Sequence, residues 1–185
     1  MKTLGLFRHA KSDWNDARLR DFDRPLNKRG REGAGLMGLH IRDYGVLWRR
    51  IIASPAVRVT QTIELAAEAA GQVPPLNWDR RIYLASSPTL MELLREQHSD
   101  QDGGPPTILM VGHNPGLEDL IFDLVPDDGS SPLRDMIEDK FPTAAFAVLE
   151  LDIEDWRDID DGCARLVHVM RPRDLDPRLG PSLED

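Results

Sequence analysis

Three short apolar segments, each followed by a segment of helical pattern, constrain the fold of this chain more than any other feature. The segments are "LGLFRH", "RRIIASP" and "PPTILMVGHNPG", which begin at residues 4, 49 and 105. Strands that alternate with helices favour a parallel sheet, because a parallel pair needs a long crossover and a helix usually supplies it. We therefore expect an α/β fold with a mostly parallel central sheet.

Local signals place the remaining elements. A helix over residues 27–44 is expected, with Asn27 as its N-cap and Gly45 at its end. Ser54 is expected to cap a second helix, which has Pro55 in its first turn and ends at Gly71. Further expected elements are an extended piece around 81–84, a helix over 87–97, a helix over 115–125 capped by Asn114, and strands over 143–151 and 165–170.

The 185 residues are within the usual range for one domain. We expect a single domain over residues 1–170 and a tail over 171–185 that is extended or disordered, because the tail is rich in proline and charge. The single cysteine, Cys163, excludes an intrachain disulfide and favours a reducing compartment. No apolar run is long enough to span a bilayer, so we expect a cytoplasmic protein, and the lack of an obvious apolar stripe favours a monomer.

The charge of the chain is unevenly distributed. The net charge of −9 disfavours nucleic acid and anionic membranes as partners. Residues 1–32, however, hold nine Lys and Arg against five Asp and Glu. This local excess indicates that the N-terminal segment gathers a small anion, although a solvated helix start over 28–31 explains part of it equally well.

Each of the three apolar segments ends in polar side chains that can carry chemistry. In α/β sheets, ligands bind beyond the carboxyl ends of the strands, so these ends are expected to meet. Guanidinium groups suit a phosphoryl group, and Arg8 at a strand end and Arg58 at a helix start supply two of them. Asn114 adds an amide donor at the next helix start. His9 and His113 then flank the phosphorus, one as the attacking neutral imidazole and the other as a hydrogen-bond donor.

Taken singly, each of these signals also has an ordinary structural explanation. A histidine can cap a helix and an arginine can form a surface ion pair; the ordered combination is much more specific. The motifs "FRHAKSDW" (7–14), "DRPLNKRG" (23–30), "SPAVRVTQT" (54–62) and "VGHNPG" (111–116) together resemble the histidine phosphatase superfamily, and within it the SixA-type phosphohistidine phosphatases. The stretch "FPTAAFAVLEL" (141–151) is similar to a later strand of the same family.

The resemblance implies a three-layer α/β/α, phosphoglycerate-mutase-like fold and assigns roles to the motif residues. His9 would be the nucleophile that is transiently phosphorylated, and Arg8, Arg58 and a protonated His113 would complete the phosphate pocket. The candidates for the rim and the adjoining loop are Lys11, Ser12 and Arg24. Ala10 replaces the glycine of the family's commonest motif, which is a small change. No cofactor or metal is expected, because the guanidinium groups supply the charge that a metal ion supplies elsewhere.

The proton donor is the weak point of the resemblance. The mutases and many larger phosphatases of the superfamily carry a glutamate after the helix that bears the second arginine. Here the equivalent residues, 77–87, contain no glutamate, and their one carboxylic acid is Asp79. The resemblance points instead to Asp21, which could equally pair with a neighbouring arginine. A missing acid favours phosphohistidine, or another good leaving group, over a sugar phosphate, because a protonated imidazole leaves as a neutral molecule.

Three functions follow, in decreasing order of support. The first is a cofactor-independent phosphatase that acts on a histidine-phosphorylated signalling or phosphocarrier protein. The second is a small-molecule phosphomonoesterase. The third, of another class, is an inactive phosphate-binding interaction module, which the joint presence of Arg8, His9, Arg58 and His113 argues against.

Overall fold

The alternation of side chains along the first strand already separates two hydrophobic cores. The computed structural model describes residues 1–72 and 75–181. In β1 (Lys2–Arg8), Leu4 and Leu6 belong to one buried cluster, and Phe7 belongs to the other. Such a period of two, with apolar residues on both faces, is typical of a strand covered on each side. Both faces of the sheet are therefore packed against helices.

The sheet has six strands in the order β3-β2-β4-β1-β5-β6. The pairs β3-β2, β2-β4 and β4-β1 are parallel, whereas β1-β5 and β5-β6 are antiparallel. The bounds of the other strands are β2 Arg50–Ala53, β3 Leu76–Trp78, β4 Thr107–Gly112, β5 Phe146–Leu151 and β6 Ala164–Met170. The expected mostly parallel α/β fold is confirmed.

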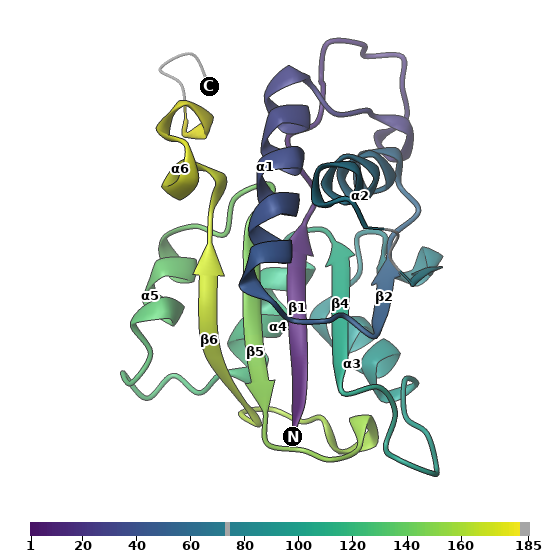
Figure 1. Ribbon diagram of the computed structural model, residues 1–185, viewed down its shortest axis with the longest axis vertical. Helices are drawn as coiled ribbons and strands as arrows, with labels where there is room; N and C mark the ends of the chain where they lie inside the picture. The colour runs from purple at the N-terminus through teal and green to yellow at the C-terminus, as the bar shows by residue number, and fades with distance from the viewer. Residues whose placement is uncertain (73–74, 182–185) are drawn as a thin grey trace.

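Helices cover the two faces unequally (Figure 1). Two long helices, α1 (Lys28–Tyr44) and α2 (Val57–Ala70), pack against each other on one face. The opposite face carries α3 (Ser87–Arg95), α4 (Gly116–Leu124) and α5 (Pro132–Asp139). The three layers expected from the resemblance are confirmed. No helix in the described ranges is both long enough and apolar enough to cross a membrane.

The connections of β1 and β4 leave the sheet on opposite faces, although the two strands are neighbours. The chain leaves β1 toward α1, and it leaves β4 toward α4 on the other side. Their carboxyl ends are level, since Arg8 pairs with Gly112 in the parallel register. Such a switch point opens a crevice at the sheet edge, which is where ligands bind in open α/β sheets.

The ends of the two long helices follow the sequence signals in three of four cases. The Asn27 side chain accepts a hydrogen bond from the Gly30 N–H, and Gly45 and Gly71 adopt left-handed conformations at the helix ends. Ser54, however, is not the N-cap of α2, which begins at Val57 after Ala56. The prediction is wrong because the Ser54 hydroxyl is engaged with His113 instead.

Asn114 is likewise not the N-cap of α4, which starts at Gly116 after Pro115. Its amide nitrogen lies within hydrogen-bond distance of the Glu118 carboxylate and donates to the Phe141 carbonyl. The side chain thereby joins two segments instead of satisfying the helix start.

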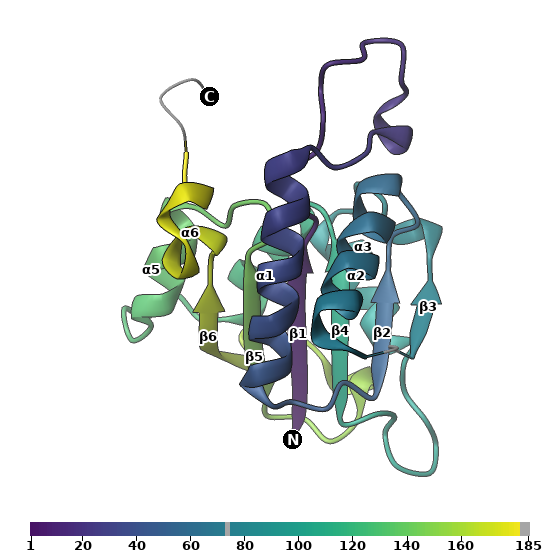
Figure 2. The same ribbon diagram turned by 45° about the horizontal axis from the view of Figure 1, so that its top comes forward.

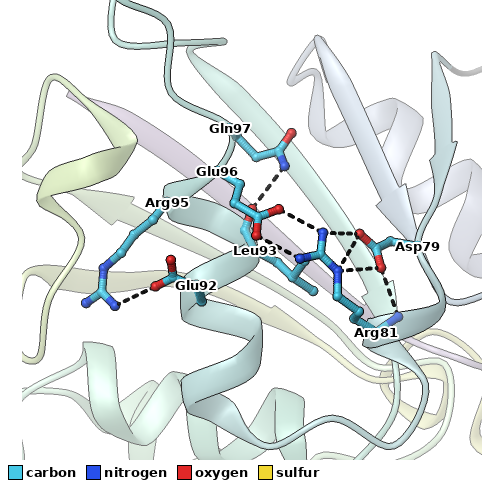
Figure 3. A network of polar contacts seen from close by, with 7 residues as sticks. All are labelled: Asp79, Arg81, Glu92, Leu93, Arg95, Glu96 and Gln97. Atoms are coloured by element: carbon cyan, nitrogen blue, oxygen red, sulfur yellow. Dashed lines mark hydrogen bonds and ion pairs between the residues drawn. The ribbon is translucent and has the colours of Figure 1, made fainter.

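The extended piece expected around residues 81–84 is also wrong. The strand lies earlier, at Leu76–Trp78, and Arg80–Ile82 forms a short 3-10 helix. Arg81 holds this turn in place, because its guanidinium binds the Asp79 and Glu96 carboxylates together and so fastens the turn to the end of α3 (Figure 3). These two ion pairs hold the 3-10 turn in place, and Tyr83 follows directly after it.

The C-terminal segment is more ordered than its composition indicates. Residues Pro172–Leu175 form α6 and Pro177–Leu179 a 3-10 turn, so the expected extended or disordered tail is wrong for these residues. Carboxylates that cap neighbouring N–H groups hold both turns: Asp174 caps Arg171, and Asp176 caps Arg178. Both views place α6 beside α1, at the end of the sheet where β1 terminates (Figure 1, Figure 2). The last predicted tail residues, 182–185, lie outside the described residues.

Candidate active site

The backbone carbonyl of the next residue, Ala10, fixes which nitrogen of the His9 ring carries the proton. His9 follows β1 and is only 7% exposed. Its Nδ1 lies 2.7 Å from the Ala10 carbonyl oxygen. A carbonyl can only accept a hydrogen bond, so Nδ1 carries the proton and Nε2 keeps its lone pair. The ring is therefore held as the tautomer that a nucleophilic imidazole requires.

The loop that holds this carbonyl is itself anchored to α2. The Ala10 N–H donates to the Thr62 hydroxyl, and that hydroxyl donates to the Arg58 carbonyl. Ala10 is fully buried, so a small side chain is required there. Ala10, which replaces the glycine of the family's commonest motif, therefore fits inside the protein at this position.

His113 lies opposite His9 across the switch point. The two ring centroids are 5.2 Å apart. Nε2 of His113 lies 2.8 Å from the Ser54 hydroxyl oxygen, which already accepts a hydrogen bond from the Ala56 N–H. Among the residues that the structure describes, the Ser54 hydroxyl has no other acceptor, so its hydrogen is directed to Nε2, and the proton of a neutral His113 lies on Nδ1. Within the described residues that buried Nδ1 has no hydrogen-bond partner.

Arg8 contributes a second buried donor that has no acceptor. One terminal nitrogen of its guanidinium donates to the Phe141 carbonyl at 2.9 Å. Its Nε has no partner among the described residues. Buried donors are almost always paired in folded proteins. Arg8 and His113 thus each contribute an unsatisfied buried donor near the His9 ring, which indicates a place where an anion binds.

Arg58 is the most deeply buried cation of the site, at 4% exposure. It donates to the Asp21 backbone carbonyl at 2.7 Å and to the Asp21 carboxylate at 3.0 Å. The Tyr83 hydroxyl donates to the same carboxylate oxygen at 2.6 Å. Asp21 and Tyr83 therefore position Arg58, and the 3-10 turn Asp21–Asp23 is tied to α2 through this contact.

Burial and nearby cations keep both histidines uncharged. Burial, followed by the charges of Arg58 and Arg8, lowers the pKa of His9 to about 3. Burial also lowers the pKa of His113 to about 3, with further contributions from His9 and Arg58. In the free protein the His113 ring is therefore neutral, and its Nδ1–H is available as a donor. The protonated His113 expected beside a bound phosphoryl group stays a prediction.

Asp21 is ionised in the same environment. The Tyr83 hydrogen bond lowers the pKa of the Asp21 carboxyl, and the charges of Arg58 and Arg24 lower it further against an opposing effect of burial. A carboxyl with a lowered pKa is a poor proton donor near neutral pH. The geometry favours a positioning role, or the role of a base.

The remaining candidate residues lie around the two histidines and the two arginines of the site. Arg24 lies 3.7 Å above the Trp14 ring, and its Nε is 3.8 Å from the second Asp21 oxygen. Ser12 is buried, and its backbone bridges to Leu26 at the base of the loop over 13–26. Lys11 lines a neighbouring cavity, and Asn114 spans Glu118 and Phe141 as described.

Two residues of the site, Tyr83 and Thr62, have no signal in the sequence, because their roles depend on contacts with residues 62 and 52 positions away in the chain. Ser54 ends the second apolar segment, but the sequence predicts only a capping role for it. Within the described part of the chain, no group of three or more His, Cys, Asp or Glu side chains is placed to hold a metal ion.

Fold and site together define an α/β protein whose switch point brings two buried, neutral histidines together with the guanidinium groups of Arg8 and Arg58. The family model of the histidine phosphatase superfamily (branch 1) matches residues 4–82. An uncharacterised protein of Mycobacterium tuberculosis is 34% identical over 167 residues, which cover 90% of this chain and 99% of the relative.

Two solved structures are similar over nearly the whole chain. A candidate phosphohistidine phosphatase SixA from Nakamurella multipartitia is 28% identical with a TM-score of 0.77, over 92% of this chain and 96% of that one. The corresponding protein from Agrobacterium tumefaciens is 27% identical with a TM-score of 0.76, over 92% of this chain and 98% of that one. The chain belongs to the histidine phosphatase superfamily and is of the SixA type, and its class of activity is that of a phosphatase.

Proposed function

We propose that this protein is a metal-independent phosphatase in which Nε2 of His9 takes the phosphoryl group, and that its substrate is phosphohistidine carried by another protein. The observation that carries the proposal is the hydrogen bond from His9 Nδ1 to the Ala10 carbonyl, which leaves the lone pair on Nε2. The lowered pKa of His9 supports it, because the ring is neutral and nucleophilic at physiological pH.

The first step is an in-line displacement. The Nε2 lone pair of His9 forms a bond to phosphorus while the bond from phosphorus to the leaving group breaks, and the leaving group departs with that electron pair. Arg8 Nε, the Arg58 guanidinium and the His113 Nδ1–H neutralise the equatorial oxygens. A phosphohistidine whose second ring nitrogen is protonated leaves as neutral imidazole, so this step needs no acid from the protein.

The second step returns His9 to its starting state. Water attacks phosphorus from the side that the leaving group vacated, the bond from phosphorus to Nε2 breaks, and inorganic phosphate is released. The ionised Asp21 carboxylate orients this water or takes its proton through the oxygen that does not hold Arg58 and Tyr83. Protein-borne phosphohistidine as the substrate is further supported by the SixA-type sequence and by the lowered pKa of Asp21, which makes this carboxyl a poor acid for a leaving group.

The variant His9→Ala tests the nucleophile. We expect it to lose at least about 1000-fold in turnover of 4-nitrophenyl phosphate, because no other neutral imidazole nitrogen is placed to attack. The matched control is His98→Ala, a partly exposed histidine that interacts with Asp100 away from the site. Denaturing the enzyme with alkali during turnover of a labelled substrate is expected to trap label on the wild-type chain and none on His9→Ala. Full turnover by His9→Ala would overturn the proposal.

Substrate class is tested separately, with a phosphorylated histidine-phosphotransfer domain and a panel of small phosphate esters. We expect a higher kcat/KM for the phosphorylated domain. A strong preference for one metabolite phosphate would exclude the protein substrate while leaving the role of His9 intact.

A further inference from the structure

A cavity of about 360 Å³ adjoins the candidate active site on the side of Arg8. Five basic residues line it, and none of its described lining residues is acidic: Arg8, Lys11, Arg29, Lys140 and Arg173. Its volume is within the range of small-ligand sites. We call this space the basic cavity.

The basic cavity is built from segments far apart in the chain. Arg8 and Lys11 come from the end of β1, Arg29 from the first turn of α1, Lys140 from the end of α5, and Arg173 from α6. The C-terminal segment over 172–181 forms one wall, and the hydrogen bond from Arg29 to the Leu179 carbonyl, 3.0 Å long, holds this wall against α1. Figures 1 and 2 show the same proximity of α6 and the start of α1.

Two cations of the basic cavity, Arg8 and Arg173, have donors that are unpaired or only weakly paired within the described residues. Arg173 lies 3.6 Å from the Asp139 carboxylate, which is largely exposed, so this contact is weak. The Nε atom of Arg8 is buried and has no acceptor within the described residues. Like charges collected in one concave space repel each other, and an anion bound among them relieves that repulsion.

We propose that the basic cavity binds a second anionic group of the substrate, a phosphate or a carboxylate, while the phosphoryl group to be transferred lies at His9. Arg8 lines the basic cavity and also belongs to the candidate active site, so the two anions would be held side by side. The inference rests on the proposed phosphatase function and narrows its substrate class to phosphorylated molecules with a neighbouring anion. In a small molecule that anion is a second phosphate, and in a protein it is an aspartate or glutamate near the phosphorylated histidine.

The small-molecule source is tested by inhibition of 4-nitrophenyl phosphate hydrolysis. Alkanediol bisphosphates of increasing length are compared with alkyl monophosphates of the same length. We expect the best bisphosphate to inhibit with a Ki about tenfold lower than its monophosphate, because only the bisphosphate reaches both anion sites. Added salt should shrink this advantage.

The variant Lys140→Gln/Arg173→Gln removes two cations of the basic cavity and no residue of the candidate catalytic centre. It should raise the bisphosphate Ki about tenfold while the KM for 4-nitrophenyl phosphate and the monophosphate Ki stay within about twofold. The matched control is Lys28→Gln/Arg49→Gln, which removes the same charge from exposed positions that do not line the basic cavity. It should leave all three constants unchanged.

The protein source is tested with phosphohistidine peptides whose flanking residues are either Asp and Glu or Asn and Gln. A lower KM for the acidic peptides that is lost in Lys140→Gln/Arg173→Gln supports the inference with a protein substrate, and a lost bisphosphate advantage supports it with a small molecule. The inference is overturned if the KM of the acidic peptides and the Ki of the bisphosphates are the same in the wild type and in Lys140→Gln/Arg173→Gln. The proposed function stands in that case as long as hydrolysis still depends on His9. Hydrolysis that persists in His9→Ala overturns the proposed function instead.

Discussion

Asp21 is better suited to positioning Arg58 than to donating a proton. Its carboxylate accepts hydrogen bonds from Arg58 and Tyr83, and these contacts hold its pKa below the ordinary value. A group that is ionised throughout the working range cannot serve as the acid for a poor leaving group. Its main contribution is then to hold the Arg58 guanidinium in the direction of the transferring oxygens.

The variant Asp21→Asn should therefore reduce kcat/KM about 10- to 100-fold, as expected for the loss of a hydrogen bond between charged groups. The reduction should be the same for aryl phosphates with good and with poor leaving groups. A plot of log kcat/KM against leaving-group pKa measures this, and wild type and variant should give parallel lines. A steeper line for Asp21→Asn would show that Asp21 donates a proton, and Tyr83→Phe, which keeps the carboxylate, should give a smaller and equally parallel loss.

At the level of single residues, the sequence predicts which side chains meet at the sheet edge but not how each one is held. The apolar segments before His9 and His113 show that both follow buried strands, and parallel pairing then brings them together. The partner of His113 is different, because Ser54 looks like a helix cap in sequence and becomes a hydrogen-bond partner only when β2 lies beside β4. The contact of Tyr83 depends on the loop conformation over 13–26 and has no local signal.

The contact between α1 and α2 depends on one glycine. A Cβ at Gly38 would lie 2.3 Å from the Ala66 carbonyl oxygen and 2.4 Å from its Cα, so the two helices could not stay as close as they are. Gly38→Ala should lower the free energy of unfolding by about 1–3 kcal/mol, the cost of overpacking. The measurement is urea denaturation followed by circular dichroism.

Gly35→Ala provides the matched control in the same helix. A Cβ at Gly35 would meet only the Ala69 side chain, at an ordinary 3.9 Å. Because alanine favours the helical backbone more than glycine does, this variant should gain about 0.5–1 kcal/mol in the free energy of unfolding. Equal effects of the two substitutions would show that backbone propensity, and not the close approach of the helices, governs α1.

Element boundaries were predictable where a backbone conformation demands one residue type. Gly45 and Gly71 end their helices with positive φ angles of 86° and 66°, which disfavour side chains. Residues 126–140 received no expected element, although Ser131 caps α5 there. The expected caps Ser54 and Asn114 failed for a common reason: both side chains are held by contacts that the fold brings in from other segments.

For the molecule as a whole, only the fold shows where the positive charge of the N-terminal segment, residues 1–32, is concentrated. Lys11 and Arg29 from that segment meet Lys140 and Arg173 from an otherwise acidic remainder around one cavity. The three layers can be predicted from the sequence, because each strand and helix has a local pattern of apolar residues. The basic cavity depends on the path of the C-terminal segment across the sheet edge, and its proline- and charge-rich sequence indicates no such path.

The two buried histidines also make the stability of the whole protein dependent on pH. The folded protein keeps both rings neutral down to a pKa of about 3, whereas in the unfolded chain they bind protons below the ordinary value of about 6.5. Between these values the unfolded state holds more protons, so the free energy of unfolding falls as the pH is lowered. Each histidine can contribute at most about 1.4 kcal/mol per pH unit below about 6.5, and none of this loss occurs above it.

Urea denaturation between pH 7.5 and pH 4.5 measures this dependence. The free energy of unfolding should be nearly constant above pH 6.5 and should decline below it, and His9→Gln and His113→Gln should each make the decline shallower. Asp21, whose pKa is lowered in the folded state, contributes with the same sign but only at lower pH, as its unfolded carboxyl begins to bind protons. If the wild-type protein lost no stability between pH 6.5 and pH 4.5, or if both variants kept its slope, the two histidines would not be the buried neutral pair on which the proposed chemistry depends.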